Sequence, residues 1–176
     1  SEYRYTGRPL AALQGLDGTG GVIYMGTFAK TLFPALRVGY LVVPDSLIDA
    51  FTNAIRMTGQ SPAPAIQAAL ADFMDDGHFT AHIRRMRTLY AGRQQHLINA
   101  LKRETGDMFI VPKLEGGMQL AAYLSNDADD VKAAEAVNAA RVFTTPLSGY
   151  YLKDAPKRGL YLGYAGVLES DIDRAA

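Results

Sequence analysis

Apolar positions in the first part of the chain form two short runs before a helical spacing begins. Residues 22–26 (VIYMG) and 37–43 (RVGYLVV) carry apolar side chains at consecutive positions, which is typical of strands buried on both faces. After Asp45 or Ser46, either of which can cap a helix, apolar residues recur at helical spacing as far as residues 59–64 (GQSPAP). The pattern therefore predicts two buried strands and then a helix.

The middle of the chain, from residue 65 to about residue 104, has a helical pattern almost throughout. Gly77 predicts a break between two helices, and the second helix is long enough to connect two lobes. One apolar stripe follows this second helix at helical spacing. Its members are Phe79, Ile83, Met86, Tyr90, Leu97 and Leu101.

The rhythm changes after residue 106, where short apolar runs alternate with helical segments. We expect strands at residues 108–112, 118–124, 141–145 and 159–165, a helix over residues 127–140 and a final helix that starts near residue 169. This order is typical of an α+β domain, so we place a domain boundary inside the long helix. The expected division is residues 1–80 and residues 81–176.

Composition narrows the classes of partner and chemistry. Lys plus Arg and Asp plus Glu number 18 each, so no net field would attract nucleic acid or an anionic membrane. The absence of cysteine excludes disulfides and thiol chemistry. No apolar run approaches the roughly 20 residues that span a bilayer. We expect a cytoplasmic protein that uses no membrane.

The stretch GTFAKTLFPALRVGY, residues 26–40, holds the candidate chemistry. An enclosed Lys30 would lose hydration, which favours the neutral amine that condenses with a carbonyl such as that of pyridoxal phosphate. Thr27 can offer a hydroxyl to the cofactor's phosphate, and Arg37 can offer a planar fork of N–H groups. The alternative is a surface lysine beside an Arg37 that pairs with an acid such as Asp17.

Residues 26–44 resemble the lysine segment of fold-type I pyridoxal-phosphate enzymes, the aminotransferase class I and II family. In that resemblance Lys30 is the catalytic lysine that forms the internal aldimine, and Thr27, Lys30 and Arg37 bind the cofactor. Further motifs resemble the aminotransferase-like domain of MocR-type regulators of the GntR family. They are SEYRYTGRPLAALQGLD (1–17), GGMQLAAYL (116–124), TTPLSGYYL (144–152) and GLYLGYAGVLESDI (159–172).

The resemblance implies an α/β fold: the second half of a fold-type I large domain followed by a small α+β C-terminal domain. It also implies a homodimer, an amino acid or amine ligand, and DNA binding only through a missing N-terminal winged helix domain. The family's aspartate for the pyridine nitrogen and its glycine-rich phosphate loop precede this segment, so we expect the fragment alone to be inactive. A free-standing aminotransferase is the alternative function, and a packing or dimerisation module with a vestigial lysine is a third hypothesis.

Weaker candidates for ligand binding lie in the second half of the chain. Gly117, beside Gly116, can bring the backbone close to a substrate. The position where many aminotransferases bind the substrate carboxylate with an arginine falls on Tyr161, with Arg158 close by, and Gln119 stands where related domains often have histidine. These departures favour a different amine, or sensing without turnover. We expect no metal site, because the three histidines read as a solvated helix face; they are His78, His82 and His96.

Overall fold

A computed structural model describes residues 2–176, and these divide into two units. The N-terminal unit holds residue 2 and residues 8–83, and the C-terminal unit holds residues 3–7 together with residues 84–176. The segment 3–7 therefore belongs to the C-terminal unit although about 80 residues separate the two in sequence. The expected domain division at residue 80 stays a prediction.

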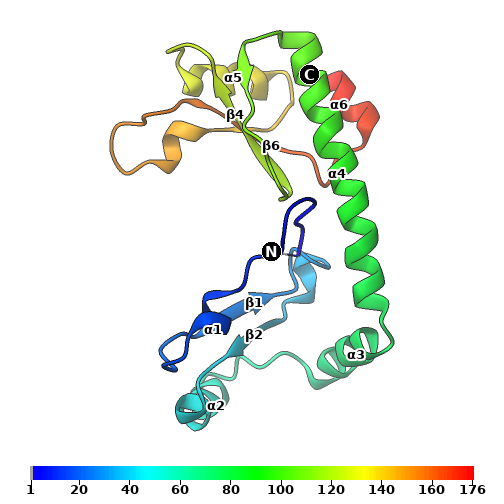
Figure 1. The fold of residues 1–176 in the computed structure, drawn as a ribbon, viewed down its shortest axis with the longest axis vertical. Helices are drawn as coiled ribbons and strands as arrows, with labels where there is room; N and C mark the ends of the chain where they lie inside the picture. Colours follow the sequence, from blue (N-terminus) through cyan, green and yellow to red (C-terminus); the bar gives the residue numbers. More distant parts are fainter. Residues whose placement is uncertain (1) are drawn as a thin grey trace. The chain divides into compact units, whose positions relative to one another are not determined.

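The N-terminal unit is built around a two-stranded antiparallel sheet (Figure 1). A single helical turn, α1 (Leu13–Leu16), precedes β1 (Tyr24–Thr27), and β2 (Gly39–Val42) pairs with β1 in the register Tyr24 to Val42. The short 3-10 helix η1 (Pro34–Leu36) lies in the connection between the strands.

The helices of this unit follow the sequence pattern closely. The 3-10 turn η2 (Asp45–Leu47) leads into α2 (Ile48–Thr58), which ends at Gly59 in the left-handed conformation. Then α3 (Pro64–Asp75) begins on a proline, where the missing N–H costs nothing. Gly77, at φ 79°, separates α3 from the long helix α4 (His78–Thr105) and confirms the predicted break.

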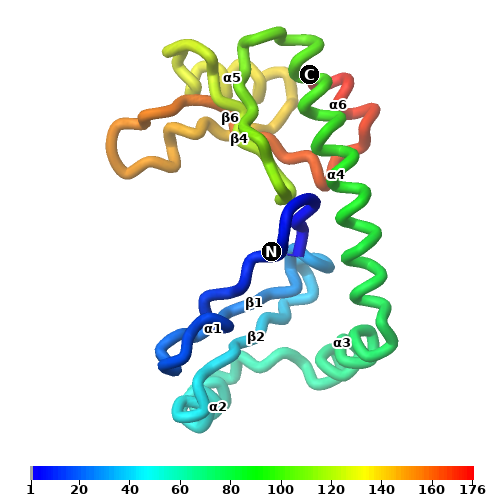
Figure 2. Tube along the Cα trace, viewed as in Figure 1, coloured from blue at the N-terminus to red at the C-terminus, as the bar shows by residue number. Residues whose placement is uncertain are grey.

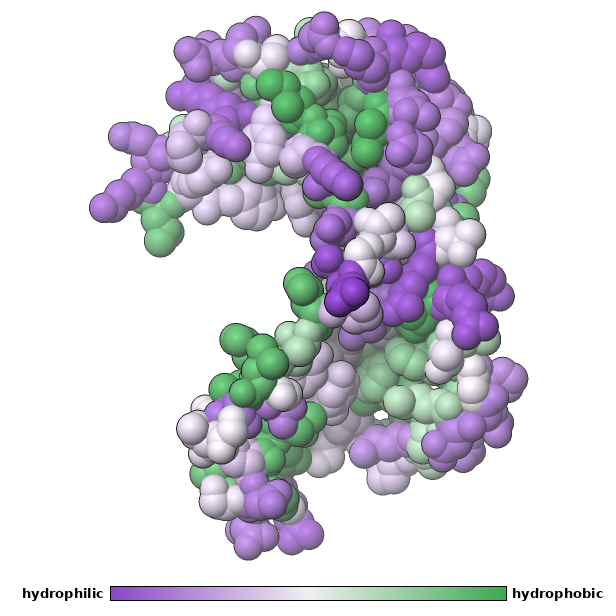
Figure 3. All heavy atoms as spheres, in the orientation of Figure 1, coloured by the Kyte–Doolittle hydropathy of each residue, from purple (hydrophilic) through white to green (hydrophobic). Residues whose placement is uncertain are grey.

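The expectation that both strands of this unit are buried is wrong. All four residues of β2 are exposed, and β1 alternates between exposed and half-buried. Within residues 2–176 the two strands pair only with each other, so each strand has one unpaired edge. The sheet is not covered on both of its faces by this part of the chain. Hydrophobic residues consequently gather at the surface of this unit (Figure 3). Among them are Leu10, Leu13, Leu16 and Met25.

The C-terminal unit contains a four-stranded antiparallel sheet in the order β3-β4-β6-β5. Its strands are β3 (Phe109–Ile110), β4 (Gln119–Leu124), β5 (Thr145–Pro146) and β6 (Gly159–Gly163). The remaining elements are α5 (Asp130–Ala139), the 3-10 helix η3 (Leu147–Tyr150) and α6 (Glu169–Ala175). Strands, helix, strands and helix occur in the order that the hydrophobic pattern predicts, although the strands are shorter.

One face of this sheet packs on helices and forms the core. Leu120 and Ala122 of β4 are buried against Leu97 and Leu101 of α4, and Ile172 of α6 joins the same cluster. Because side chains alternate along a strand, the residues between them in β4 lie on the opposite face. The stripe predicted along α4 thus supplies core residues at its C-terminal end.

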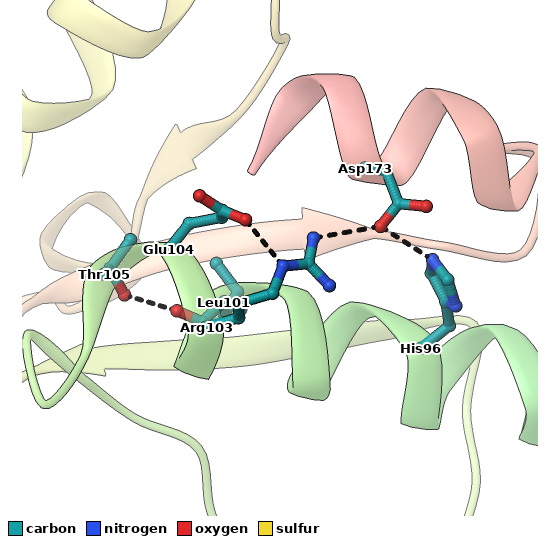
Figure 4. A network of polar contacts seen from close by, with 6 residues as sticks. All are labelled: His96, Leu101, Arg103, Glu104, Thr105 and Asp173. Carbon is teal, nitrogen blue, oxygen red and sulfur yellow. Dashed lines mark hydrogen bonds and ion pairs between the residues drawn. The ribbon is translucent and has the colours of Figure 1, made fainter.

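Helix α6 is fixed to α4 by a polar network as well as by packing (Figure 4). An Asp173 carboxylate oxygen accepts a hydrogen bond of 3.1 Å from the Arg103 guanidinium and lies 3.1 Å from Nε2 of His96. The bond from Arg103 is the main reason that the pKa of Asp173 lies below its ordinary value. His96 therefore has a structural partner on α6.

Candidate cofactor and ligand site

The lysine segment forms a closed loop between β1 and β2. The N–H of Phe28 donates to the carbonyl of Val38 at 3.1 Å, which extends the strand pairing into the loop, and the N–H of Leu32 donates to the carbonyl of Phe28 at 2.8 Å. Lys30 lies inside this turn. Its backbone position is thus fixed by hydrogen bonds on both sides.

The first turn of α4 supports the same loop from beneath. The ring of Phe79 packs edge-on against Phe28 with centroids 5.9 Å apart, and Nε2 of His82 lies 2.9 Å from the carbonyl oxygen of Thr31. Thr31 itself is 5% exposed. The sequence offered no sign of these contacts, because they join residues about 50 positions apart. His82, which we predicted to lie on a solvated helix face, in fact anchors the loop next to Lys30.

Lys30 is exposed, and within residues 2–176 its amine makes no hydrogen bond or ion pair. The dehydration expected for an enclosed amine is therefore not provided by this part of the chain. What residues 2–176 do provide is a primary amine on a fixed backbone with no carboxylate paired to it. In its neutral form, such an amine can react with a carbonyl group that is brought to it.

Arg37 has a backbone conformation that is uncommon for a residue with a side chain. It follows η1 at φ 52° and ψ 34°, in the left-handed region, which costs roughly 1–2 kcal/mol for a non-glycine residue. Its side chain is exposed, and no carboxylate among residues 2–176 pairs with it. Strain of this kind is a reason to examine a residue for function.

The alternative that Arg37 pairs with Asp17 is wrong. The Asp17 carboxylate accepts hydrogen bonds from the N–H and hydroxyl of Thr19, at 2.9 and 2.6 Å, and from the N–H of Val22 at 2.8 Å. These bonds, the Thr19 hydroxyl first, lower the pKa of Asp17 to about 2. Asp17 closes its own turn, so the Arg37 guanidinium keeps its donors for another anion.

Thr27 lies at the end of β1, at the entrance to the lysine loop. Its hydroxyl accepts from the N–H of Ala29 at 3.2 Å and donates to the carbonyl of Val38 at 3.4 Å. Thr27, Lys30 and Arg37 thus come from one loop of one unit and offer a hydroxyl, an amine and a guanidinium. This donor set fits an anionic phosphate joined to an aldehyde.

Both glycines of the LEGG turn contact residues 3–5 through the backbone, and each is required for its own reason. Arg4 forms a β-bridge with Gly116, and the N–H of Gly117 donates to the carbonyl of Tyr3 at 2.8 Å. A Cβ added to Gly116 would lie 2.2 Å from the Tyr3 carbonyl oxygen, so no other residue fits there. Gly117 adopts φ 115°. The SEYRY and LEGG motifs, more than 100 residues apart, are two halves of one structure.

Tyr161 and Gln119 face each other on the side of the sheet that is opposite the core. The Tyr161 hydroxyl donates to Oε1 of Gln119 at 3.0 Å, and the ring of Tyr150 packs against Tyr161. Arg158 is not grouped with them, because it lines a separate cleft of about 240 Å³ with residues that include Tyr123. The structure thus brings together Tyr161 and Gln119, which lies two positions after Gly117 in the sequence. Arg158 is not part of this pair.

The family model of "Aminotransferase class I and II" matches residues 4–176. The chain belongs to the aminotransferase class I and II family. It is 46% identical over 167 residues to the probable rhizopine catabolism regulatory protein MocR of Rhizobium meliloti, which covers 95% of the chain and 34% of that protein. It is also 36% identical over 171 residues to YhdI of Bacillus subtilis, an uncharacterized HTH-type transcriptional regulator, covering 97% of the chain and 36% of YhdI.

The fold of this aminotransferase-family chain matches solved aminotransferases. A kynurenine aminotransferase of Pyrococcus horikoshii, in complex with PMP, superposes with a TM-score of 0.85 at 29% identity, over 99% of this chain and 43% of that one. A multiple substrate aminotransferase of Thermococcus profundus gives the same TM-score at 26% identity, over 99% and 43%. The predicted resemblance and the fold class are therefore confirmed.

The aminotransferase-family chain spans about a third of the length of the curated regulators that it matches. Across residues 2–176, no helix combines the length and apolar character needed to cross a membrane. The same residues contain no group of three or more histidine, aspartate or glutamate side chains arranged to hold a metal ion.

Proposed function

We propose that the chain is part of a pyridoxal-phosphate-binding effector domain in a MocR-type transcriptional regulator. The main observation behind this proposal is that Lys30 and Arg37 belong to one hydrogen-bonded loop. Both are exposed, and neither has an acidic partner in residues 2–176. The similarity to MocR and to several HTH-type regulators supports the regulatory context. The relative solved in complex with PMP supports the choice of cofactor.

Each residue of the loop has a distinct task in this proposal. Lys30 would hold pyridoxal phosphate through its amine, bonded to the aldehyde carbon after the aldehyde oxygen leaves as water. The guanidinium of Arg37 would donate to the phosphate oxygens, and the hydroxyl of Thr27 would turn from the Val38 carbonyl to donate to the same group. Pyridoxal phosphate, when bound, supplies an electron sink next to the amine nitrogen of the ligand. The loop fixes where the cofactor is held.

The ligand in this proposal is an amino acid or another amine. Gly117 and Tyr161 are its candidate contacts in the C-terminal unit, with Arg158 as a weaker candidate. We further propose that the whole protein is a cytoplasmic homodimer that binds DNA through a winged helix domain outside this chain. The HTH-type relatives support that last part.

A free-standing aminotransferase is the second candidate. An aromatic-amino-acid aminotransferase of Thermococcus litoralis is 27% identical over 171 residues, and the solved aminotransferases share the fold at a TM-score of 0.85. Reading the gene upstream of residue 1 separates the two candidates. A winged helix coding sequence supports the regulator, and a cofactor domain that begins the gene supports the enzyme.

The direct experiment is an absorbance spectrum of the purified full-length protein. We expect the visible band of a lysine-bound cofactor in the wild type and its loss in Lys30→Ala. Lys102→Ala is the matched control, because Lys102 is an exposed lysine of α4 that pairs only with Asp107 within residues 2–176. A wild type without the band, or a Lys30→Ala variant that keeps it, would refute the proposal.

A further inference from the structure

The segment formed by residues 3–7 is held in the C-terminal unit by backbone hydrogen bonds on both sides of the LEGG turn. The N–H groups of Tyr5 and Thr6 both donate to the carbonyl of Glu115, at 2.7 and 3.2 Å, and the N–H of Gly117 donates to the carbonyl of Tyr3. Figure 2 shows the dark blue trace of this segment against the start of β4. We refer to residues 3–7 as the N-terminal clip.

Tyr5 adds a side-chain bond to this backbone pairing. Its hydroxyl donates to the carbonyl of Gly117 and lies 3.5 Å from the hydroxyl of Tyr164. Tyr164 is fully buried, and it accepts a hydrogen bond of 2.9 Å from the amide nitrogen of Gln94 on α4. Burial, followed by the contact with Tyr164, raises the pKa of Tyr5, so the hydroxyl keeps its proton and remains a donor.

The number of protons on each hydroxyl decides which group donates in this series of hydrogen bonds. A tyrosine hydroxyl has a single proton, and that of Tyr5 is used on the Gly117 carbonyl. Tyr164 must therefore donate to Tyr5, which leaves its oxygen free to accept from Gln94. The order Gln94 to Tyr164 to Tyr5 to Gly117 connects the long helix to the turn, and each bond polarises the next.

Gly117 is consequently held at both of its polar backbone groups. Its N–H is used by Tyr3 and its carbonyl by Tyr5, in a conformation at φ 115° that needs glycine. Two residues later β4 begins with Gln119, which is bonded to Tyr161. The backbone of Gly117 can therefore offer a ligand space and the second lone pair of its carbonyl oxygen, but no N–H donor.

We infer that Tyr5 is a positioning residue for ligand binding. It fixes the turn that carries Gly117 and the start of β4 that carries Gln119, without touching the ligand itself. The inference rests on the proposed function, in which Gly117 and Tyr161 contact the amine ligand. Removing the Tyr5 hydroxyl should loosen this turn and leave the lysine loop, which belongs to the other unit, unchanged.

The test uses the full-length protein loaded with pyridoxal phosphate and the variant Tyr5→Phe. Two amines serve as probes, L-alanine and methylamine, and each is titrated while the visible cofactor band is recorded. Methylamine is too small to reach beyond the reacting carbon, so it reports on Lys30 alone. Tyr123→Phe is the matched control, because the Tyr123 hydroxyl makes no hydrogen bond within residues 2–176. A phenylalanine ring at this position would keep the cation–π contact with Lys157.

We expect Tyr5→Phe to keep the cofactor band and the methylamine response and to weaken the L-alanine response about five- to tenfold, the effect of one lost hydrogen bond. Gln94→Met removes the first hydrogen bond of the same series, two groups before Tyr5. It should weaken the L-alanine response less. An unchanged L-alanine response, a wild type that responds to neither amine, or an equal loss with both amines would overturn the inference. A wild type without the cofactor band would instead refute the proposed function, and the inference with it.

Discussion

Asp130 provides the sharpest test of how the C-terminal unit is held together. Its side chain is 1% exposed at the start of α5, and one carboxylate oxygen accepts from the N–H of Ser148 at 2.9 Å and from the N–H of Gly159 at 3.0 Å. Ser148 lies within η3 and Gly159 is the first residue of β6, so the carboxylate joins the elements on either side of the connection between them. Asp130 therefore closes that connection and sets where β6 begins.

Replacing Asp130 by alanine leaves two backbone N–H groups without their acceptor. A buried donor that loses its partner costs roughly 1–3 kcal/mol, and bonds to a charged acceptor lie in the upper part of that range. The carboxylate also no longer has to be buried, which offsets part of the loss. We expect Asp130→Ala to reduce the free energy of unfolding by about 3 kcal/mol, and Asp130→Asn, which keeps an acceptor oxygen, by about 1 kcal/mol.

The same bonds give the stability a defined pH dependence. Burial raises the pKa of Asp130, but the hydrogen bonds from Ser148 and Gly159 outweigh it, so the pKa in the folded protein lies below its ordinary value. A depressed carboxyl pKa contributes stability that is complete above the unfolded value of about 3.9 and is lost as the pH falls through the folded value. The difference between wild type and Asp130→Asn should therefore shrink in acid.

Urea unfolding at pH 7 and again near pH 3 measures both effects. Asp127→Ala is the control, because the exposed Asp127 makes no hydrogen bond within residues 2–176. If Asp130→Ala unfolds at the same urea concentration as the control, the role assigned to the buried carboxylate is refuted. A destabilisation by Asp130→Asn that does not change with pH would refute the electrostatic part alone.

Three further predictions follow from the turns and the loop. Gly116→Ala should break the bridge to the N-terminal clip and lower the free energy of unfolding by roughly 2–3 kcal/mol in urea, whereas Gly166→Ala, where an added Cβ meets nothing within 4 Å, should be nearly neutral; similar midpoints for both would count against the bridge. Arg37→Lys should weaken binding of pyridoxal phosphate about tenfold and leave binding of phosphate-free pyridoxal unchanged, as measured by fluorescence titration, because a lysine cannot form the bidentate fork; an equal loss for both forms would exclude the phosphate contact. Thr19→Ala should raise the pKa of Asp17 from about 2 toward its ordinary value in a carboxyl NMR titration, since the Thr19 hydroxyl is the main cause of the shift; an unmoved titration would contradict that cause.

The sequence predicted the elements of this fold well where side-chain periodicity decides the structure. The helix break at Gly77, the stripe that ends at Leu97 and Leu101, and the order of strands and helices after residue 106 are all confirmed. Burial of the strands at residues 22–26 and 37–43 was wrong, because periodicity reports what a strand can bury and not which neighbours are present to cover it.

Some features of the candidate site could also be predicted from the sequence, and others could not. Motif resemblance identified the lysine loop, and the structure adds that His82 supports it and that Asp17 is not the partner of Arg37. The bridge between Arg4 of the N-terminal clip and Gly116 could not be predicted from spacing, since the two segments lie more than 100 residues apart and neither has a strand pattern. Such contacts depend on the path of the folded backbone, which the local sequence does not indicate.

We propose that the amine of Lys30 bonds to pyridoxal phosphate in the whole protein. Reduction of the full-length protein with borohydride, followed by peptide mass spectrometry, would locate this bond. We expect a single phosphopyridoxyl group on the peptide that contains Lys30, at close to one group per chain. An unmodified Lys30, or the group distributed over surface lysines such as Lys102 and Lys157, would contradict it.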